Sequence, residues 1–240
     1  MKFMALAALL LTGAAFAGPI SLPGEDYVLN DIAQMGLKKE VLFSKMDRQF
    51  IKLGDSICAN RAQMWTYEFK RQHNIDAAKM FLFYTMKSGE GSRKDWWYHV
   101  TPVINENGAM WTMDAGFGGI KSPLKFNDWF HYFVGSANCK EIKDSDVDLI
   151  ERMFKGMRYP DVTSYGAYDC YYRVVPATYW FPSHVATHLL GRNEEGRPTR
   201  LERTEFDVDE VFQACVEATT GPMNRWLGGG KKQCKEWLGM

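Results

Sequence analysis

The sequence has no excess of either charge, since its 240 residues include 29 Lys and Arg and 29 Asp and Glu. Proteins that bind nucleic acid or anionic membranes through their overall field carry a clear basic excess. Neither partner is therefore indicated. After the first 17 residues the chain also lacks any apolar run near the roughly 20 residues that a membrane-spanning helix needs. We expect the mature chain to be soluble.

Motifs for nucleotides and metals are missing as well. Gly116, Gly118 and Gly119 do not form a dinucleotide-binding fingerprint, because the ordered spacing and the strand–turn–helix setting are absent. His184 and His188 have the i, i+4 spacing of two metal ligands on one helical face. Val185 stands where the Glu of an H-E-x-x-H motif would follow, however, and no third ligand is evident. The sequence predicts an activity that uses neither metal nor cofactor.

The first 17 residues have the pattern of a secretory signal peptide. Lys2 supplies the positive charge, Phe3 to Leu11 form the apolar run, and Ala15-Phe16-Ala17 is a small-x-small cleavage signal. The apolar run is too short for a membrane anchor, which is the alternative. We expect cleavage after Ala17 and export to the periplasm or the medium. Loss of Lys2 leaves a formal charge of −1.

The five cysteines are an odd number, so at least one thiol remains unpaired. Export permits disulfide bonds. Two bridges and a free Cys58 are the expected partition. Four cysteines allow three pairings. Order along the chain favours Cys139 with Cys170 and Cys215 with Cys234, and the other two pairings remain open.

The hydrophobic pattern predicts an α+β protein with helices packed on a small antiparallel sheet. We expect one catalytic domain over residues 54–240, after an N-terminal arm at 18–53, because no repeat or linker divides the chain. The turn Asn105–Gly108 contains Asn-Gly and should join two strands as a hairpin. Strands are predicted at 80–86, 97–104 and 109–114, and helices at about 44–52, 56–71, 124–134, 144–157 and 208–219.

Three residues in chain order suggest a cysteine nucleophile. Cys58 lies near a predicted helix start, where the helix dipole favours thiolate over thiol. His99 and Asp114 lie on the two strands of the predicted hairpin, where cross-strand neighbours can touch. A thiolate attacks an acyl carbon, an imidazole moves protons, and a carboxylate orients the imidazole. Each residue also has a structural alternative: a buried thiol, a core histidine and a turn-forming aspartate.

These residues lie in motifs that resemble the bacterial protein-glutaminases. The motifs are C-x-x-R-A starting at Cys58, W-x-Y-H-V starting at Trp96, and an aspartate, Asp114, after an apolar strand. The segment from Tyr171 to Tyr179 is also similar. Members of that family are secreted enzymes that deamidate glutamine side chains within proteins and peptides. One departure is Ala115, which stands where the family usually has proline.

The resemblance implies a role for each matching residue. Cys58 would be the nucleophile, His99 the general acid and base, and Asp114 the orienting carboxylate. It also implies an α+β fold with a transglutaminase- or papain-like core, and protein or peptide substrates with exposed glutamine. Trp96 matches the family's aromatic residue before the histidine. Together with Trp97 it is our candidate for the wall of the substrate slot.

Two other functions remain open at this stage. The same three catalytic groups would serve a transglutaminase or a papain-like cysteine peptidase. A secreted binding domain with an inert Cys58 belongs to a different class. The sequence does not identify the natural target protein or the oligomeric state.

Overall fold

The computed structural model describes residues 18–46, 58–85, 97–154, 168–191, 205–224 and 229–240. The predicted signal peptide at 1–17 and the candidate slot residue Trp96 lie outside these residues. So does most of the helix predicted at 44–52. Cleavage after Ala17 and the domain limits at 18–53 and 54–240 therefore stay predictions.

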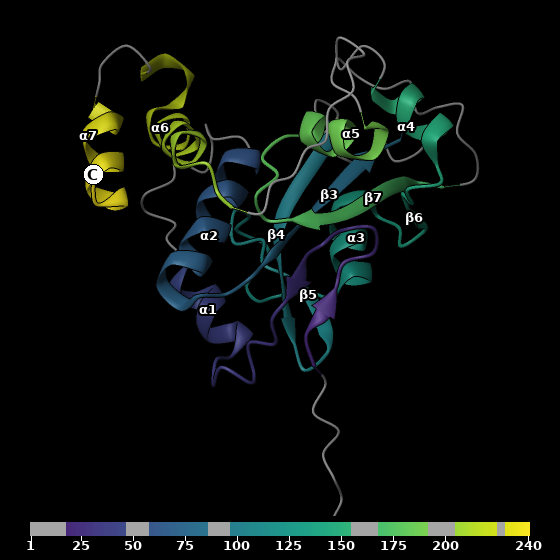
Figure 1. The fold of residues 1–240 in the computed structure, drawn as a ribbon, viewed down its shortest axis with the longest axis horizontal. Coiled ribbons are helices and arrows are strands. Elements are labelled where there is room, and N and C mark those ends of the chain that lie inside the picture. Colours follow the sequence, from purple (N-terminus) through teal and green to yellow (C-terminus); the bar gives the residue numbers. More distant parts are fainter. Residues whose placement is uncertain (1–17, 47–57, 86–96, 155–167, 192–204, 225–228) are drawn as a thin grey trace, which may run out of the picture.

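A five-stranded sheet forms the centre of the molecule (Figure 1). Its order is β5-β4-β3-β7-β6, with the hairpin strands β4 and β5 at one end. The strands are β3 (Ala78–Tyr84), β4 (Tyr98–Glu106), β5 (Ala109–Thr112), β6 (Cys139–Glu141) and β7 (Cys170–Pro176). All pairs are antiparallel except β6 with β7, which is parallel. The predicted α+β class is confirmed, with a sheet that is mixed at one edge.

The predicted hairpin is confirmed, and its turn explains its register. Asn107 and Gly108 have φ values of 55° and 72°. Positive φ at both central residues is the signature of a type I′ turn, whose twist matches that of the flanking strands. Strand β4 consequently pairs with β5 in the register Val103↔Thr112 and Glu106↔Ala109. This register decides which side chains beyond the end of β5 can reach β4.

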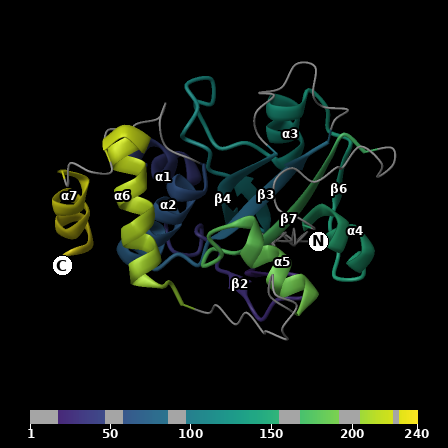
Figure 2. The same cartoon turned by 90° about the horizontal axis from the view of Figure 1, so that it is seen from above.

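The described part of the chain contains seven helices, including all or part of those predicted beyond residue 55. They are α1 (Lys39–Lys45), α2 (Cys58–His73), α3 (Phe126–Val134), α4 (Val147–Phe154), α5 (Pro182–Leu190), α6 (Val208–Asn224) and α7 (Gly229–Leu238). Figures 1 and 2 place α2 between the sheet and α6, with α7 outermost. None of the helices in these described ranges is long and apolar enough to cross a membrane.

The core forms where α2 packs against the sheet. Every residue of β3 is buried, as expected for a strand flanked on both sides and covered on both faces. Residues 58–66 of α2 are also all buried, because this part of the helix lies between the sheet and α6. The polar Lys79 of β3 is accommodated there. Its ammonium donates to Gln63 of α2 and, at 2.9 Å, to the carbonyl oxygen of Tyr179.

The N-terminal arm is fastened to this core. It carries the short strands β1 (Ile20–Ser21) and β2 (Val28–Leu29) before α1. The Tyr27 hydroxyl donates to the carbonyl oxygen of Ala77 at 2.8 Å, just before β3 begins. The Lys39 ammonium forms an ion pair with Glu106 at the far end of β4. The second contact holds α1 beside the turn of the β4–β5 hairpin.

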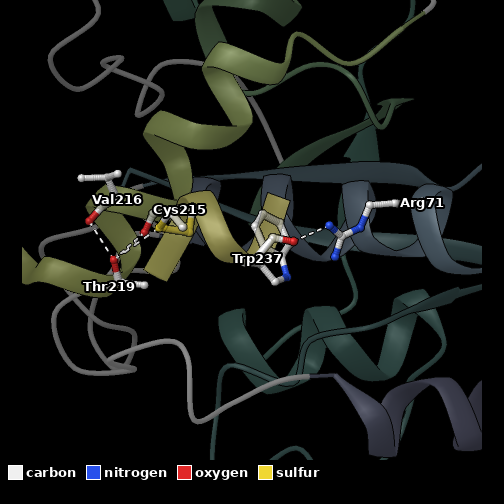
Figure 3. The surroundings of a disulfide bond; sticks show 6 residues. Arg71, Cys215, Val216, Thr219 and Trp237 are labelled. Carbon is white, nitrogen blue, oxygen red and sulfur yellow. Dashed lines mark hydrogen bonds between the residues drawn. A yellow bond between two sulfur atoms is a disulfide. The ribbon is translucent and has the colours of Figure 1, made fainter. Parts of the chain in front are cut away.

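The expected cysteine partition is confirmed. Cys139 is bonded to Cys170 and Cys215 to Cys234, while Cys58 is free. The second bridge joins α6 to α7, and Figure 3 shows its surroundings. There the Thr219 hydroxyl donates to the carbonyl oxygen of Cys215 at 2.9 Å.

The helix pair α6–α7 also contacts α2 directly. The Asn60 amide donates to the Glu217 carboxylate of α6 at 3.0 Å. Arg71, in the last turn of α2, donates to the carbonyl oxygen of Trp237 in α7 (Figure 3). The second disulfide therefore stabilises a support for the helix that begins at Cys58.

A double variant, Cys215→Ala with Cys234→Ala, tests this support. We expect its free energy of unfolding to fall by about 2–4 kcal/mol, because the unfolded chain gains freedom when the bridge is lost. Urea unfolding followed by circular dichroism measures the change. Reductant should lower the wild-type midpoint at least as far as this variant's. Equal midpoints for oxidised wild type and the double variant would contradict the expectation.

Candidate active site

The thiol of Cys58 lies at the first residue of α2, and 9% of the residue is exposed. Helix α2 packs against β4, which brings the thiol to the His99 imidazole. The imidazole and the backbone N–H of Val100 both lower the pKa of the thiol. The helix start adds a partial positive charge at the same position. The surroundings of Cys58 therefore favour a thiolate.

The imidazole of His99 is held on its other side by Asp114. Its Nε2 lies 2.7 Å from Oδ2 of the carboxylate, and both side chains are buried. The hairpin register accounts for this contact. Thr112 pairs with Val103, so Asp114 comes opposite Thr101 just beyond β5, and His99 is its diagonal neighbour. Diagonal residues on an antiparallel pair are near enough for long side chains to touch.

Electrostatics favour a thiolate–imidazolium pair. Burial alone would raise the pKa of the Cys58 thiol, but the hydrogen bond and positive charge of His99, with Arg61 and the Val100 N–H, bring this pKa below its ordinary value. Burial alone would lower the pKa of His99, but the charge and hydrogen bond of Asp114, with Cys58, raise it to about 9. Between the two pKa values the thiol is ionised and the imidazole protonated. This state is the one that cysteine nucleophiles use.

Two further side chains, Arg61 and Tyr98, interact electrostatically with Cys58. Arg61 is buried one turn along α2, with its guanidinium 5.6 Å from the centre of the Phe117 ring. Burial, with the negative charge of Cys58, raises the pKa of Tyr98. The Tyr98 hydroxyl near the Cys58 sulfur is therefore neutral across the whole neutral pH range.

Gly116 has no side chain, and this allows the Arg61 guanidinium to lie against its backbone. A Cβ at this glycine would stand 2.8 Å from Nε of Arg61. The loop after Asp114 thus packs its backbone directly on a guanidinium.

Of the two tryptophans predicted to line the substrate slot, the structure describes only Trp97. Trp96 lies outside the described residues. Trp97 packs against Phe83 and Phe154, with ring centres 6.1 and 6.5 Å away. It also contacts the Tyr98 ring, at 4.7 Å between centres. A role of either tryptophan in substrate binding stays a prediction.

The structure adds Trp129 to the site. Its indole Nε1 donates to Oδ2 of Asp114 at 3.0 Å, and its ring stacks on His99 with centres 5.4 Å apart. The sequence predicted only the helix at 124–134 that carries this residue. The indole N–H was the only sequence feature that could have indicated a further role for Trp129, because a buried indole N–H usually has a hydrogen-bond partner.

Asn60 is the second addition, two residues after Cys58. Its carbonyl oxygen accepts a hydrogen bond from the Trp180 indole at 3.1 Å, while its amide donates to Glu217. An amide at this position thereby joins the first turn of α2 to the segment after β7 and to α6. Both partners are more than 100 residues away, so no local pattern pointed to them.

The two histidines considered as metal ligands have other partners. Nδ1 of His184 accepts a hydrogen bond from the backbone N–H of Trp180 at 3.1 Å. Nε2 of His188 lies 3.1 Å from Glu25. Within the described ranges no three His, Cys, Asp or Glu side chains are grouped so that they could hold a metal ion.

Comparison with known proteins identifies the segment that carries this site. Residues 36–133 match a protein-family model described as Glutaminase. This part of the chain is similar to the glutaminase family. It contains Cys58, His99, Asp114 and Trp129. The match confirms the resemblance drawn from the motifs at Cys58 and Trp96, and with it the predicted class of enzyme, a glutamine amidohydrolase.

One solved structure is similar to the chain as a whole. It is the NMR structure of protein-glutaminase from Chryseobacterium proteolyticum, with a TM-score of 0.43 and 14% sequence identity. The alignment covers 79% of this chain and 86% of that chain. No curated protein matches the sequence.

The pH dependence of alkylation tests the ion pair. Iodoacetamide reacts with thiolate, so Cys58 should react rapidly below neutral pH, where an ordinary thiol near pKa 8.5 is protonated. The rate should fall only as the pH drops through the lowered pKa of Cys58. In His99→Ala the favourable charge is lost, and the rate near pH 6 should fall at least roughly tenfold.

Circular dichroism of His99→Ala controls for folding in this comparison. A folded His99→Ala protein with an unchanged pH profile would show that His99 does not ionise the thiol. A wild-type profile that rises only above pH 8 would mean that Cys58 is an ordinary buried thiol.

Proposed function

We propose that the chain is an exported protein-glutamine deamidase in which Cys58, His99 and Asp114 form the catalytic triad. The observation that carries the proposal is the buried hydrogen bond between Asp114 and His99, with His99 lowering the pKa of the Cys58 thiol. The glutaminase-family match over the same residues supports glutamine as the substrate side chain. The signal-peptide pattern at residues 1–17 supports export. Protein or peptide substrates follow from the motif resemblance.

In the first half-reaction the Cys58 thiolate attacks the γ-carboxamide carbon of glutamine. The C–S bond forms as the carbonyl electron pair moves to oxygen, and the tetrahedral intermediate collapses with loss of the C–N bond. The departing nitrogen takes the proton of the His99 imidazolium and leaves as ammonia. A thioester to Cys58 and a neutral imidazole remain.

In the second half-reaction the neutral imidazole takes a proton from water. The resulting hydroxide adds to the thioester carbon, and the Cys58 thiolate leaves as the C–S bond breaks. Glutamate is released, and the thiolate–imidazolium pair is restored. Asp114 holds Nε2 by its hydrogen bond throughout, so that the other ring nitrogen of His99 serves the sulfur and the substrate.

The raised pKa of His99 suits this cycle. The amide nitrogen is a poor leaving group unless it receives a proton, so the imidazolium has to be present when the C–N bond breaks. Asp114 keeps it protonated up to about pH 9. Deamidation should therefore decline as the pH rises through this value, because the acid is lost, and at low pH, because the thiolate is lost.

The test is to incubate the purified mature protein with a glutamine-containing peptide and with Cys58→Ala alongside. We expect ammonia release and a gain of about one mass unit per glutamine, since an –NH₂ becomes –OH. The alanine variant should retain the circular dichroism spectrum and release no ammonia. Comparable activity in a folded Cys58→Ala would refute a Cys58 mechanism.

The products also separate the other functions that the triad permits. Cross-linked peptides with ammonia would indicate acyl transfer to an amine, as in a transglutaminase. New amino termini would indicate a peptidase. Neither ammonia nor cleavage, together with slow alkylation of Cys58, would favour a secreted binding domain.

A further inference from the structure

We propose that Trp129 is a positioning residue of the reaction, which sets both the orientation of Asp114 and the protonation of His99. The inference rests on the proposed function of the triad. Trp129 touches neither the nucleophile nor the departing nitrogen in that scheme. It acts on the two residues that control the charge of Cys58.

The first observation is that two donors share one carboxylate oxygen. Oδ2 of Asp114 accepts from the Trp129 indole at 3.0 Å and faces Nε2 of His99 at 2.7 Å. Two bonds from different elements fix the direction in which this oxygen points. Asp114 is 2% exposed, and a buried carboxylate stays ionised only where donors or a positive charge replace its lost water.

The second observation is the stacking of the same indole on the imidazole. The rings of Trp129 and His99 lie 23° from parallel with centres 5.4 Å apart. Phe117 meets the imidazole nearly edge-on, and Phe133 approaches it at 4.4 Å between centres. These rings confine the imidazole to one plane. The negative face of an indole within about 6 Å also favours imidazolium over imidazole.

The position of α3 makes this double contact possible. Trp129 is fully buried near the middle of α3, which packs beside β5 (Figure 1). The helix ends at Gly135, whose φ of 73° provides the left-handed C-cap. Trp129 is thereby fixed relative to Asp114 at the end of the hairpin. A phenylalanine would fill much of the same space, so packing alone does not require an indole N–H.

Trp129→Phe separates the hydrogen bond from the packing. The variant retains an aromatic ring against His99 but leaves Oδ2 of Asp114 with one donor. We expect the carboxylate to turn from Nε2, the imidazolium to be less favoured, and the pKa of Cys58 to rise. The midpoint of the alkylation profile should move to higher pH, and the rate near pH 6 should fall roughly tenfold, the scale of one lost hydrogen bond to a charged group.

Trp180→Phe is the matched control. It too removes a buried indole donor from a side-chain oxygen, that of Asn60 at 3.1 Å, but outside the Asp114–His99 pair. Both variants should lose similar stability in urea, while only Trp129→Phe should shift the alkylation midpoint. Equal shifts of the alkylation midpoint in both variants would mean that Trp129 contributes only general packing, and would overturn the proposal. A downward shift in Trp129→Phe would mean that the indole competes with His99 for the carboxylate, and would also overturn the proposal.

A double-mutant cycle with Asp114→Asn completes the test. If the indole acts through the carboxylate, adding Trp129→Phe to Asp114→Asn should produce no further shift. An additional shift of the same size as in wild type would refute action through Asp114.

Steady-state deamidation adds an independent readout. Trp129→Phe should lower kcat and leave KM nearly unchanged, since the indole does not contact substrate. Because alkylation needs no substrate, the positioning role is decided even if glutamine is not the substrate. Failure of the proposed function would appear instead as no ammonia from wild type alongside a normal alkylation profile.

Discussion

The structure of this site depends on one constraint: an imidazole, a carboxylate and a thiol are buried together, where an unpaired charge is costly. Each group is acceptable there because a neighbour compensates for it. Asp114 stabilises the charge of His99, and His99 stabilises that of Cys58. Burial strengthens these interactions because the interior has a low dielectric constant. The same burial that penalises each charge alone makes the thiolate–imidazolium pair stable.

The fold supplies this arrangement from three separate pieces. The β4–β5 hairpin fixes His99 and Asp114 in diagonal positions through a turn that permits only one register. Helix α2 brings the thiol to the imidazole from its first residue. Helix α3 contributes the Trp129 indole, which contacts both the His99 ring and the Asp114 carboxylate. Movement of any one piece would leave a buried charge without its partner.

Helices α6 and α7 support α2, the helix that begins at Cys58. Asn60 joins the first turn of α2 to α6 through Glu217, and Arg71 joins its last turn to α7 through Trp237. The second disulfide holds α6 to α7. Helices α6 and α7 thus support the helix that begins at Cys58.

Local patterns in the sequence determined much of this protein. The Asn-Gly turn, the helix start near Cys58 and the apolar helical face around Trp129 each depend on neighbours in the chain, so their elements could be predicted. Three residues in order, two of them within recognisable motifs, were enough to predict the chemistry and the family resemblance. Strands β6 and β7 were not predicted, since β6 is short and polar and Arg173 interrupts the apolar run of β7.

Tertiary structure decided what depends on distance through space. It selected one disulfide pairing among three, because only the packing of α6 on α7 and of β6 beside β7 sets which sulfurs meet. It paired Asn60 with Trp180 and Glu217, and Trp129 with Asp114, across sequence separations that no periodic pattern spans. The residue types of the proposed catalytic site are therefore determined by the sequence itself. Their protonation and orientation are properties of the burial and contacts that exist only in the folded chain.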